Sequence, residues 1–124
     1  MDHRVQEFVA DTVRNVVGLD VALFFQANPA AFDTPAGLAL RLHRRVEEIQ
    51  PALDRLTASQ VLEVFSRGDG RYHCYCLRRD REAWNLLCLV SHEYLDVPDS
   101  RKEIVRMLVR QQAADRSGGT PPEN

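Results

Sequence analysis

Residues 33–56 read DTPAGLALRLHRRVEEIQPALDRL, and this stretch decides the fold. Thr34 comes directly before Pro35, and a hydroxyl before a proline at the first helical position is a strong signal for the start of a helix. The spacing predicts one helix over 35–42, a corner at 43–45 and a second helix over about 46–58. The apolar residues that would meet where these helices cross are Leu38, Ala39, Leu42, Ile49, Leu53 and Leu56.

The predicted corner contains His43. A tight corner between two helices usually needs a residue in the left-handed conformation, for which glycine is the common choice. Histidine adopts that conformation more readily than most residues, at some cost in free energy. Ala39 is small where the helices approach most closely, and Ile49 is placed to anchor the second helix. This pattern predicts a corner of fixed geometry.

A β-hairpin is expected after the helix pair. Residues 61–65 and 72–77 are rich in β-formers, and RGDGR lies between them at 67–71. Asp-Gly is typical of a two-residue hairpin turn. A turn at 69–70 pairs Val64 with Tyr75 and Leu62 with Leu77, and points these four at the core. By alternation, the opposite face then carries Phe65, Tyr72, Cys74 and Cys76.

Further helices are expected on both sides of this segment. The periodicity predicts a helix over 3–17 that Gly18 ends as a C-terminal cap, and a second over 21–27 with Asp20 as its N-cap. Asp80 is expected to cap a helix over 81–95, and a capping box at Ser100 to start a last helix over 100–112. Residues 1–112 are thus expected to form a single domain, and the polar stretch 113–124 a disordered tail.

In this order, the segments between about residues 19 and 77 resemble a bacterial winged helix-turn-helix domain. The resemblance rests on the helix over 21–27, the extended residues at Phe32, the helix pair around His43 and the hairpin over 61–77. It implies a mainly α fold with a small β-hairpin wing and extra N- and C-terminal helices. The helix over 46–58 would be the recognition helix, and 67–71 the tip of the wing. Winged helices mostly bind duplex DNA, often as dimers, and a minority bind only proteins.

The resemblance also implies a set of residues that face DNA. Arg44 and Arg45 would contact phosphate or guanine, Gln50 would pair with adenine, and Arg67 and Arg71 would straddle a minor groove. The full set is Thr34, Arg44, Arg45, Glu48, Gln50, Asp54, Arg55, Arg67 and Arg71. The chain as a whole has a net charge of −2, but residues 34–81 hold nine arginines against six acids. This basic segment favours a polyanionic partner.

Two features of the recognition helix favour the alternative, a winged-helix module that binds another protein and no nucleic acid. Glu47, Glu48 and Asp54 place three acids on this helix, where they repel phosphates unless they meet a cytosine amino group. Pro51 lies within the helix and removes a backbone donor. Duplex DNA therefore remains the expected partner, with a protein partner as the alternative.

The sulfur and imidazole groups suggest two further alternatives. Cys74 and Cys76 share one face of a strand, and Cys88 and His92 share one face of a helix. Three thiols and an imidazole form a legitimate zinc set, although the expected role of the cysteines is apolar packing, with no metal and no cofactor. A redox sensor is the other alternative, because thiols on an outer strand face can be reactive.

Composition limits the remaining possibilities. The chain has 124 residues, three cysteines and no apolar run of about eighteen residues, so we expect a cytoplasmic protein with reduced thiols that spans no membrane. No nucleophile–base motif or glycine-rich phosphate loop is present in the sequence, which argues against an enzyme. The apolar stripes of the terminal helices need cover. A two-fold homodimer that exchanges contacts between these helices would supply it, and the alternative is that the helices fold back on their own core.

Overall fold

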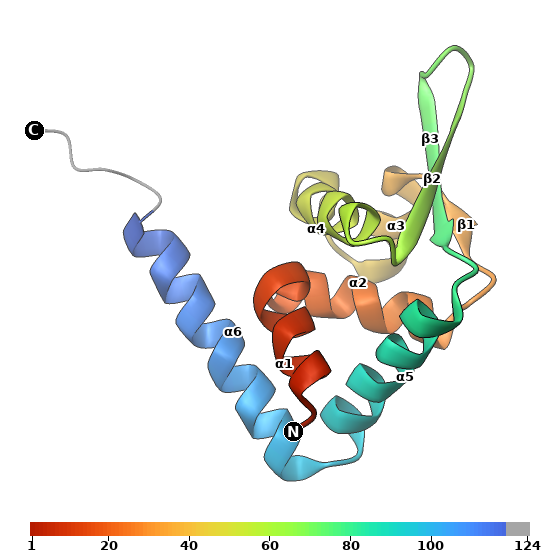
Figure 1. The fold of residues 1–124 in the computed structure, drawn as a ribbon. Helices are drawn as coiled ribbons and strands as arrows, with labels where there is room; N and C mark the ends of the chain where they lie inside the picture. The colour runs from red at the N-terminus through yellow and green to blue at the C-terminus, as the bar shows by residue number, and fades with distance from the viewer. Residues whose placement is uncertain (119–124) are drawn as a thin grey trace, which may run out of the picture.

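Three helices and a small sheet form the centre of the fold, and further helices from both ends of the chain pack beneath them (Figure 1). The computed structural model describes residues 1–118. The elements are α1 (His3–Phe8), the π-helical segment η1 (Val9–Val13), α2 (Val16–Ala27), β1 (Phe32–Asp33), α3 (Pro35–Leu42), α4 (Val46–Ala58), β2 (Leu62–Arg67), β3 (Tyr72–Leu77), α5 (Arg81–Leu95) and α6 (Pro98–Gly118). The sheet is antiparallel with the order β1-β3-β2. The expected mainly α, winged helix-turn-helix fold is confirmed.

The helix pair around His43 forms as the sequence predicts. The Thr34 hydroxyl accepts the Gly37 N–H at 3.1 Å, and Pro35 occupies the first position of α3. His43 has φ 56° and ψ 44°, which is the left-handed conformation. The chain then reverses, and the Arg44 N–H donates to the Ala39 carbonyl at 2.9 Å. These contacts fix where α4 begins and how it crosses α3.

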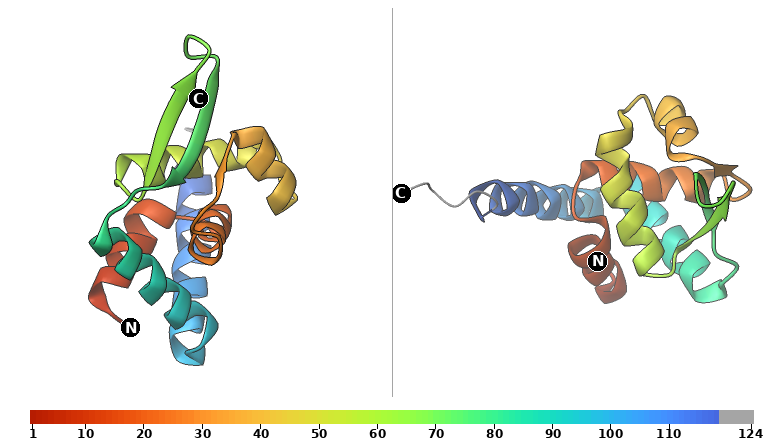
Figure 2. Two further views of the ribbon diagram at one scale, coloured as in Figure 1. Left: turned by 90° about the vertical axis from the view of Figure 1, so that its right-hand side faces the viewer. Right: turned by 90° about the horizontal axis from the view of Figure 1, so that it is seen from above.

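The hairpin has the predicted register. Leu62 pairs with Leu77 and Val64 with Tyr75, as a turn at residues 69–70 requires. Asp69 and Gly70 both have positive φ values, 58° and 85°, which are the signature of the type I′ turn. One part of the prediction is wrong, because Val64 is 39% exposed instead of buried. The hairpin projects beyond the helices, so only its base reaches the core (Figure 2).

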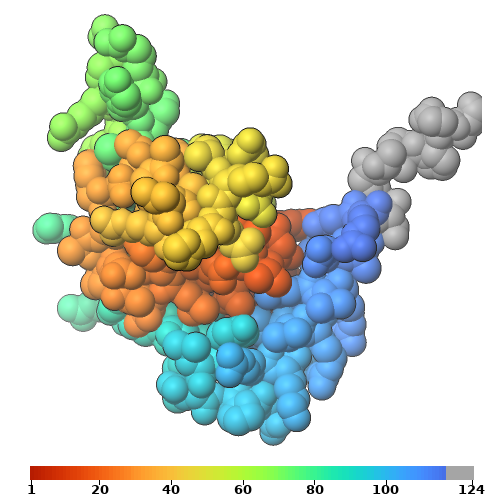
Figure 3. Space-filling model, turned by 180° about the vertical axis from the view of Figure 1, so that it is seen from behind, coloured from red at the N-terminus to blue at the C-terminus, as the bar shows by residue number. Residues whose placement is uncertain are grey.

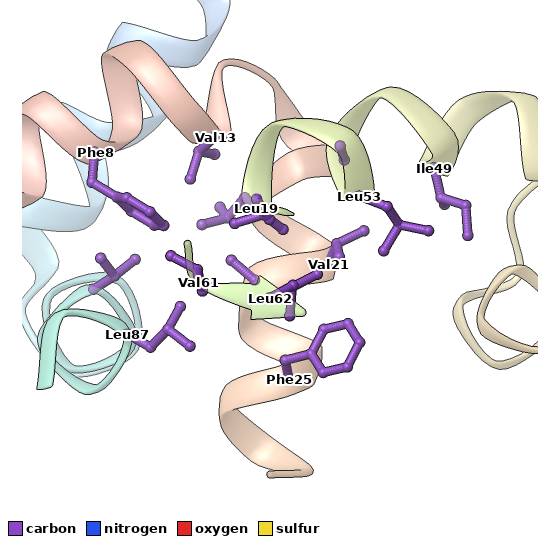
Figure 4. Close-up of a cluster of buried hydrophobic side chains, with 14 of the residues drawn as sticks. Phe8, Val13, Leu19, Val21, Phe25, Ile49, Leu53, Val61, Leu62 and Leu87 are labelled. Carbon is purple, nitrogen blue, oxygen red and sulfur yellow. The ribbon is translucent and has the colours of Figure 1, made fainter. Parts of the chain in front are cut away.

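The core joins side chains from the terminal helices, the helix pair and the base of the sheet (Figure 4). Leu53 of α4 lies close to Val21 of α2, and Leu62 of β2 lies close to Phe25 (Figure 4). The wedge predicted between α3 and α4 is confirmed for all of its members except Leu42, which is only partly buried. Helices outside the winged-helix segment contribute Val5 of α1, Leu87 of α5 and Ile104 of α6, so they complete the same core.

The N-terminal helix differs from the prediction. The expected helix over 3–17 breaks at Arg14, whose φ is 65°, and Asn15 starts α2 by accepting the Gly18 N–H at 2.8 Å. Asp20 is therefore inside α2 and does not cap it. Gly18 is not a C-terminal cap either, because it lies in the first turn of α2, where a Cβ would be 2.1 Å from the Val13 carbonyl oxygen. The glycine is needed for this close approach.

The C-terminal helix is longer than predicted. It begins at Pro98, so Ser100 lies buried in its first turn and does not cap it. It continues to Gly118, past the expected end at 112, and the rest of the expected tail lies outside the described residues. α5 and α6 form a V, with α1 between its arms (Figure 1). Within residues 1–118, no helix is both long enough and apolar enough to cross a membrane.

Gly18→Ala is expected to destabilise the fold, because the new methyl group would meet backbone atoms that cannot move aside. Overpacking of this kind costs about 1–3 kcal/mol of unfolding free energy, measurable by urea denaturation. Gly37→Ala is the matched control, since the three atoms nearest to its Cβ would belong to the Asp33 side chain, which can shift at the cost of its hydrogen bond to the Thr34 N–H. An equal cost for both substitutions would contradict the close approach at Gly18.

Candidate nucleic-acid interface

The candidate interface is formed by the corner before α4, the outward face of α4 and the wing. Seen from behind, the wing stands out as a separate projection beside α3 and α4 (Figure 3). The wing consists of β2, β3 and the turn Gly68–Arg71, whose Arg71 N–H donates to the Gly68 carbonyl at 3.1 Å. The side chains of this surface differ in whether their polar groups are already bonded to other parts of the protein.

The outward face of α4 is acidic. Glu47, Pro51, Asp54 and Ala58 are all exposed and follow one another at helical spacing. Pro51 lies inside the helix without ending it, and α4 runs unbroken to Ala58. The stripe that a recognition helix would turn toward a groove therefore carries two carboxylates and no arginine.

Arg44 is engaged by acids of its own chain. Its Nε donates to Asp20 Oδ2 at 3.0 Å, and a second guanidinium nitrogen pairs with the same oxygen. Glu48 Oε2 lies 3.8 Å from the guanidinium, and only 24% of the Arg44 side chain is exposed. The charge of Arg44 is thus largely neutralised by carboxylates of the same chain. The main effect of Arg44 is to tie the start of α4 to α2.

Glu48 acts as the cap of α4. Its Oε1 accepts the Arg45 N–H at 2.9 Å. This backbone hydrogen bond, assisted by the charges of Arg45 and Arg44, lowers the pKa of the Glu48 carboxyl from its ordinary value. The carboxylate satisfies a free backbone donor at the first turn, where a negative charge also suits the helix dipole. This hydrogen bond explains why one of the three acids on α4, Glu48, is present: it stabilises the start of the helix.

Gln50 is held by the wing. Its Nε2 donates to the Tyr75 hydroxyl at 3.1 Å and to Asp54 Oδ1 at 3.0 Å. Both amide hydrogens are therefore used inside the protein, and pairing with adenine would first require them to be released. The contact joins the middle of α4 to the base of β3, which fixes the angle of the wing against the helix.

Arg55 points into the protein, contrary to the prediction that it faces DNA. Its Nε donates to the Thr12 carbonyl at 2.8 Å, and Nη2 donates to the Val13 carbonyl at 3.1 Å. Burial, and then the charge of Arg14, lowers the pKa of the Arg55 guanidinium. Arg55 satisfies carbonyl groups at the end of η1, so it belongs to the fold and not to the candidate interface.

Three arginines of the predicted set are free to meet a ligand. Arg45 has 75% of its side chain exposed, with only a 3.7 Å contact to Glu48. Arg67 and Arg71 on the wing are exposed and form no ion pair within residues 1–118, although Arg71 Nε donates to the Gly68 carbonyl at 3.1 Å. Thr34 caps α3 and is partly exposed. The free positive charge thus lies at the start of α4 and on the wing.

The alternative zinc set does not assemble. Cys74 and Cys76 lie on the sheet, while the Cys88 sulfur is 3.9 Å from Gln26 Nε2 and His92 Nδ1 is 3.1 Å from Asp96. No group of three or more metal-binding side chains comes together in the described part of the chain. Burial, and then Glu63, raises the pKa of the Cys76 thiol, which lowers its thiolate fraction and disfavours the redox alternative.

The sequence did not predict the role of two residues of this surface. Tyr75 was expected only as a core residue, but a buried tyrosine hydroxyl usually needs a hydrogen-bond partner, and this requirement pointed to a neighbour such as Gln50. Asp20 was assigned to a helix cap, and no local pattern places it beside Arg44. That ion pair depends on how α2 crosses α4, which sequence spacing does not specify.

Comparison with solved structures supports the fold. The chain is similar to a protein from Methanosarcina mazei Go1 described as a possible transcriptional regulator, with a TM-score of 0.56. The two sequences are 16% identical, and the match covers 80% of this chain and 83% of the other. No family model matches the chain, and no curated protein matches it. At this identity, the likeness concerns the fold alone.

Arg55→Ala is expected to lower the unfolding free energy by about 1–3 kcal/mol, because two carbonyl groups lose a charged donor. Arg45→Ala is the matched control, since most of its side chain is in solvent, and it should change stability by about 0.5 kcal/mol or less. Urea denaturation monitored by circular dichroism measures both. Equal effects would contradict the structural role assigned to Arg55.

Proposed function

We propose that this chain is a transcription regulator that binds duplex DNA as a homodimer and acts by binding, not by catalysis. The observation that carries the proposal is the distribution of free cations on a winged helix-turn-helix fold. Arg45, Arg67 and Arg71 project from the start of α4 and from the wing, where the fold meets a duplex in other winged helices. Exposed arginines whose charge is not buried against an acid of the same chain are suited to phosphate oxygens and to a narrow minor groove.

The acidic face of α4 sets the character of the proposed contact. Glu47 and Asp54 repel phosphates, so α4 gains little affinity from the DNA backbone and must fit into the groove between the two DNA strands. A carboxylate in the major groove accepts a hydrogen bond from the amino group of cytosine. The proposal therefore assigns most of the affinity to the corner and the wing, and assigns base preference to α4. The description of the Methanosarcina protein as a possible transcriptional regulator agrees with this reading.

The homodimer part of the proposal rests on α6. Val105 and Val109 are 43% and 59% exposed and lie four residues apart, so they share one face of the helix. Ala113, one turn further on, is also exposed. An apolar stripe on a long terminal helix is suited to the same stripe of a second copy packed about a two-fold axis. A dimer would present two wings and two recognition helices to paired half-sites.

A second candidate function is a winged-helix module that binds a protein and no nucleic acid. The exposed carboxylates of Glu47 and Asp54, together with the internal hydrogen bonds of Arg44 and Gln50, favour it. In that case the α4 face would meet a basic surface of the partner. Titration with DNA separates the two candidates, because the module would not bind a duplex even at low salt.

The combined substitution Arg67→Ala and Arg71→Ala is expected to weaken duplex binding and to reduce the slope of log affinity against log salt by about 2. The measurement is fluorescence anisotropy of a labelled duplex of random sequence at several salt concentrations. Arg81→Ala with Arg106→Ala removes the same charge from exposed sites on α5 and α6 and should leave the slope unchanged. An equal change in slope for the two double variants would mean that the wing is not part of the interface.

Val109→Asp is expected to convert the dimer into a monomer, because it places two charges inside the proposed apolar contact between copies of α6. Sedimentation velocity measures the change. Leu40→Asp is the control, since Leu40 is a 79% exposed apolar residue on α3, away from α6. A wild-type protein that is already monomeric at micromolar concentration would contradict this part of the proposal.

A further inference from the structure

One face of the sheet carries exposed aromatic side chains that nothing covers within residues 1–118. We call it the outer sheet face and define it by its apolar residues Phe32, Phe65, Tyr72, Cys74 and Cys76. The strand pairing places the charged Glu63 and Arg67 on the same face. In the left view of Figure 2, β2 and β3 pass in front of α4, and no helix crosses them on the near side. Phe32, Phe65 and Tyr72 are 47%, 48% and 59% exposed. Several large exposed aromatic groups on one face of a small domain are typical of a binding surface.

Two of these aromatic side chains lie side by side. The ring centroids of Phe32 and Phe65 are 6.0 Å apart, and the ring planes are inclined by 35°. They come from β1 and β2, which flank β3 on either side. Tyr72 extends the row toward the tip of the wing, since alternation puts it on the same face as Cys74 and Cys76. The result is a row of ring surfaces along the sheet.

Arginines border this row at both ends. Arg67 pairs with Tyr72 across the hairpin and shares the outer sheet face with it. At the other end, Arg78 and Arg79 line a shallow hollow together with Phe65 and Cys76. None of these three arginines forms an ion pair in the described chain, 1–118. Glu63, which also lines the hollow, is a single carboxylate against them, so the border is positive.

We propose that the outer sheet face binds single-stranded DNA. Unpaired bases offer flat apolar surfaces that stack on aromatic side chains, and the phosphates that join them are attracted to arginines. The row of rings with positive ends matches both properties. Duplex DNA does not, because its base faces are already stacked inside the helix. A second copy of the chain fits poorly, because a two-fold contact would bring one positive border close to another.

This binding and the proposed duplex contact share Arg67 but no aromatic residue. The outer sheet face lies on the side of the sheet opposite to α4, and none of its aromatic residues contributes to the corner or the wing tip. The protein would therefore bind unpaired bases whether or not it also binds a duplex. In a complex with both, the wing would hold a duplex on one side and an unpaired strand on the other.

The test is fluorescence anisotropy of a short labelled oligothymidylate titrated with the full chain at low and moderate salt. We expect salt-dependent binding that Phe65→Leu weakens about tenfold or more, because leucine keeps the apolar contact with the sheet and loses the ring surface. Phe65→Tyr keeps the ring and should retain binding. Arg79→Ala should weaken binding and reduce its salt dependence. Leu95→Ala on α5 is the control, since Leu95 is a 56% exposed apolar residue outside both proposed contacts, and it should have no effect.

Several outcomes would overturn the proposal. One is no binding of oligothymidylate by the wild-type protein at low salt. Another is binding that Phe65→Leu leaves unchanged, which would place the strand elsewhere. A third is a wild-type dimer that Phe65→Leu dissociates in sedimentation velocity, which would mean that a second copy covers this face. The same variants titrated with duplex DNA keep the two proposals apart, since Phe65→Leu should leave duplex binding intact.

Discussion

The carbonyl group of Val13 is the point on which the arrangement of the helices depends. It accepts the Asn15 N–H at 2.7 Å and a guanidinium hydrogen of Arg55 at 3.1 Å. It also lies so close to Gly18 that no Cβ fits between them. One backbone oxygen thus fixes the end of η1, the start of α2 and the last turn of α4. The direction of α4, and with it the surface offered to a ligand, follows from this junction.

Local sequence signals predicted the parts of the fold that local physics determines. Three local signals impose a backbone conformation on their own neighbours, namely Thr34-Pro35, His43 and Asp69-Gly70. The helix pair and the hairpin register could therefore be predicted from the sequence. The N-terminal break could not, because a helical apolar period continues through residues 13–17 and hides it. In the sequence, Gly18 has the position of a helix cap. Its actual constraint is a carbonyl group that only the folded backbone brings close.

The candidate site was less predictable than the fold, for a related reason. Sequence spacing shows which side chains leave the outward half of a helix, but it does not show which partners the rest of the protein provides. Arg44 and Arg55 looked equivalent to Arg45, yet one meets Asp20 of α2 and the other meets the end of η1. A long arginine side chain on a small domain readily reaches an acceptor on a neighbouring element. The hairpin projects away from the other elements, so its arginines form no ion pair within residues 1–118, and Arg71 bonds only the Gly68 carbonyl of its own turn.

The junction at Val13 also connects α6 to α4, but through contacts of unequal strength. Arg14, next to Val13, meets Asp115 of α6 at 3.2 Å, with 35% and 50% of the two side chains exposed. An exposed pair of this kind contributes about 0–1 kcal/mol, whereas a charged hydrogen bond to a carbonyl contributes about 1.5–3 kcal/mol. Movement at the end of α6 would therefore break the Arg14–Asp115 pair first and leave Arg55 in place. The orientation of α4 therefore depends more on the two Arg55 hydrogen bonds than on the ion pair at the end of α6.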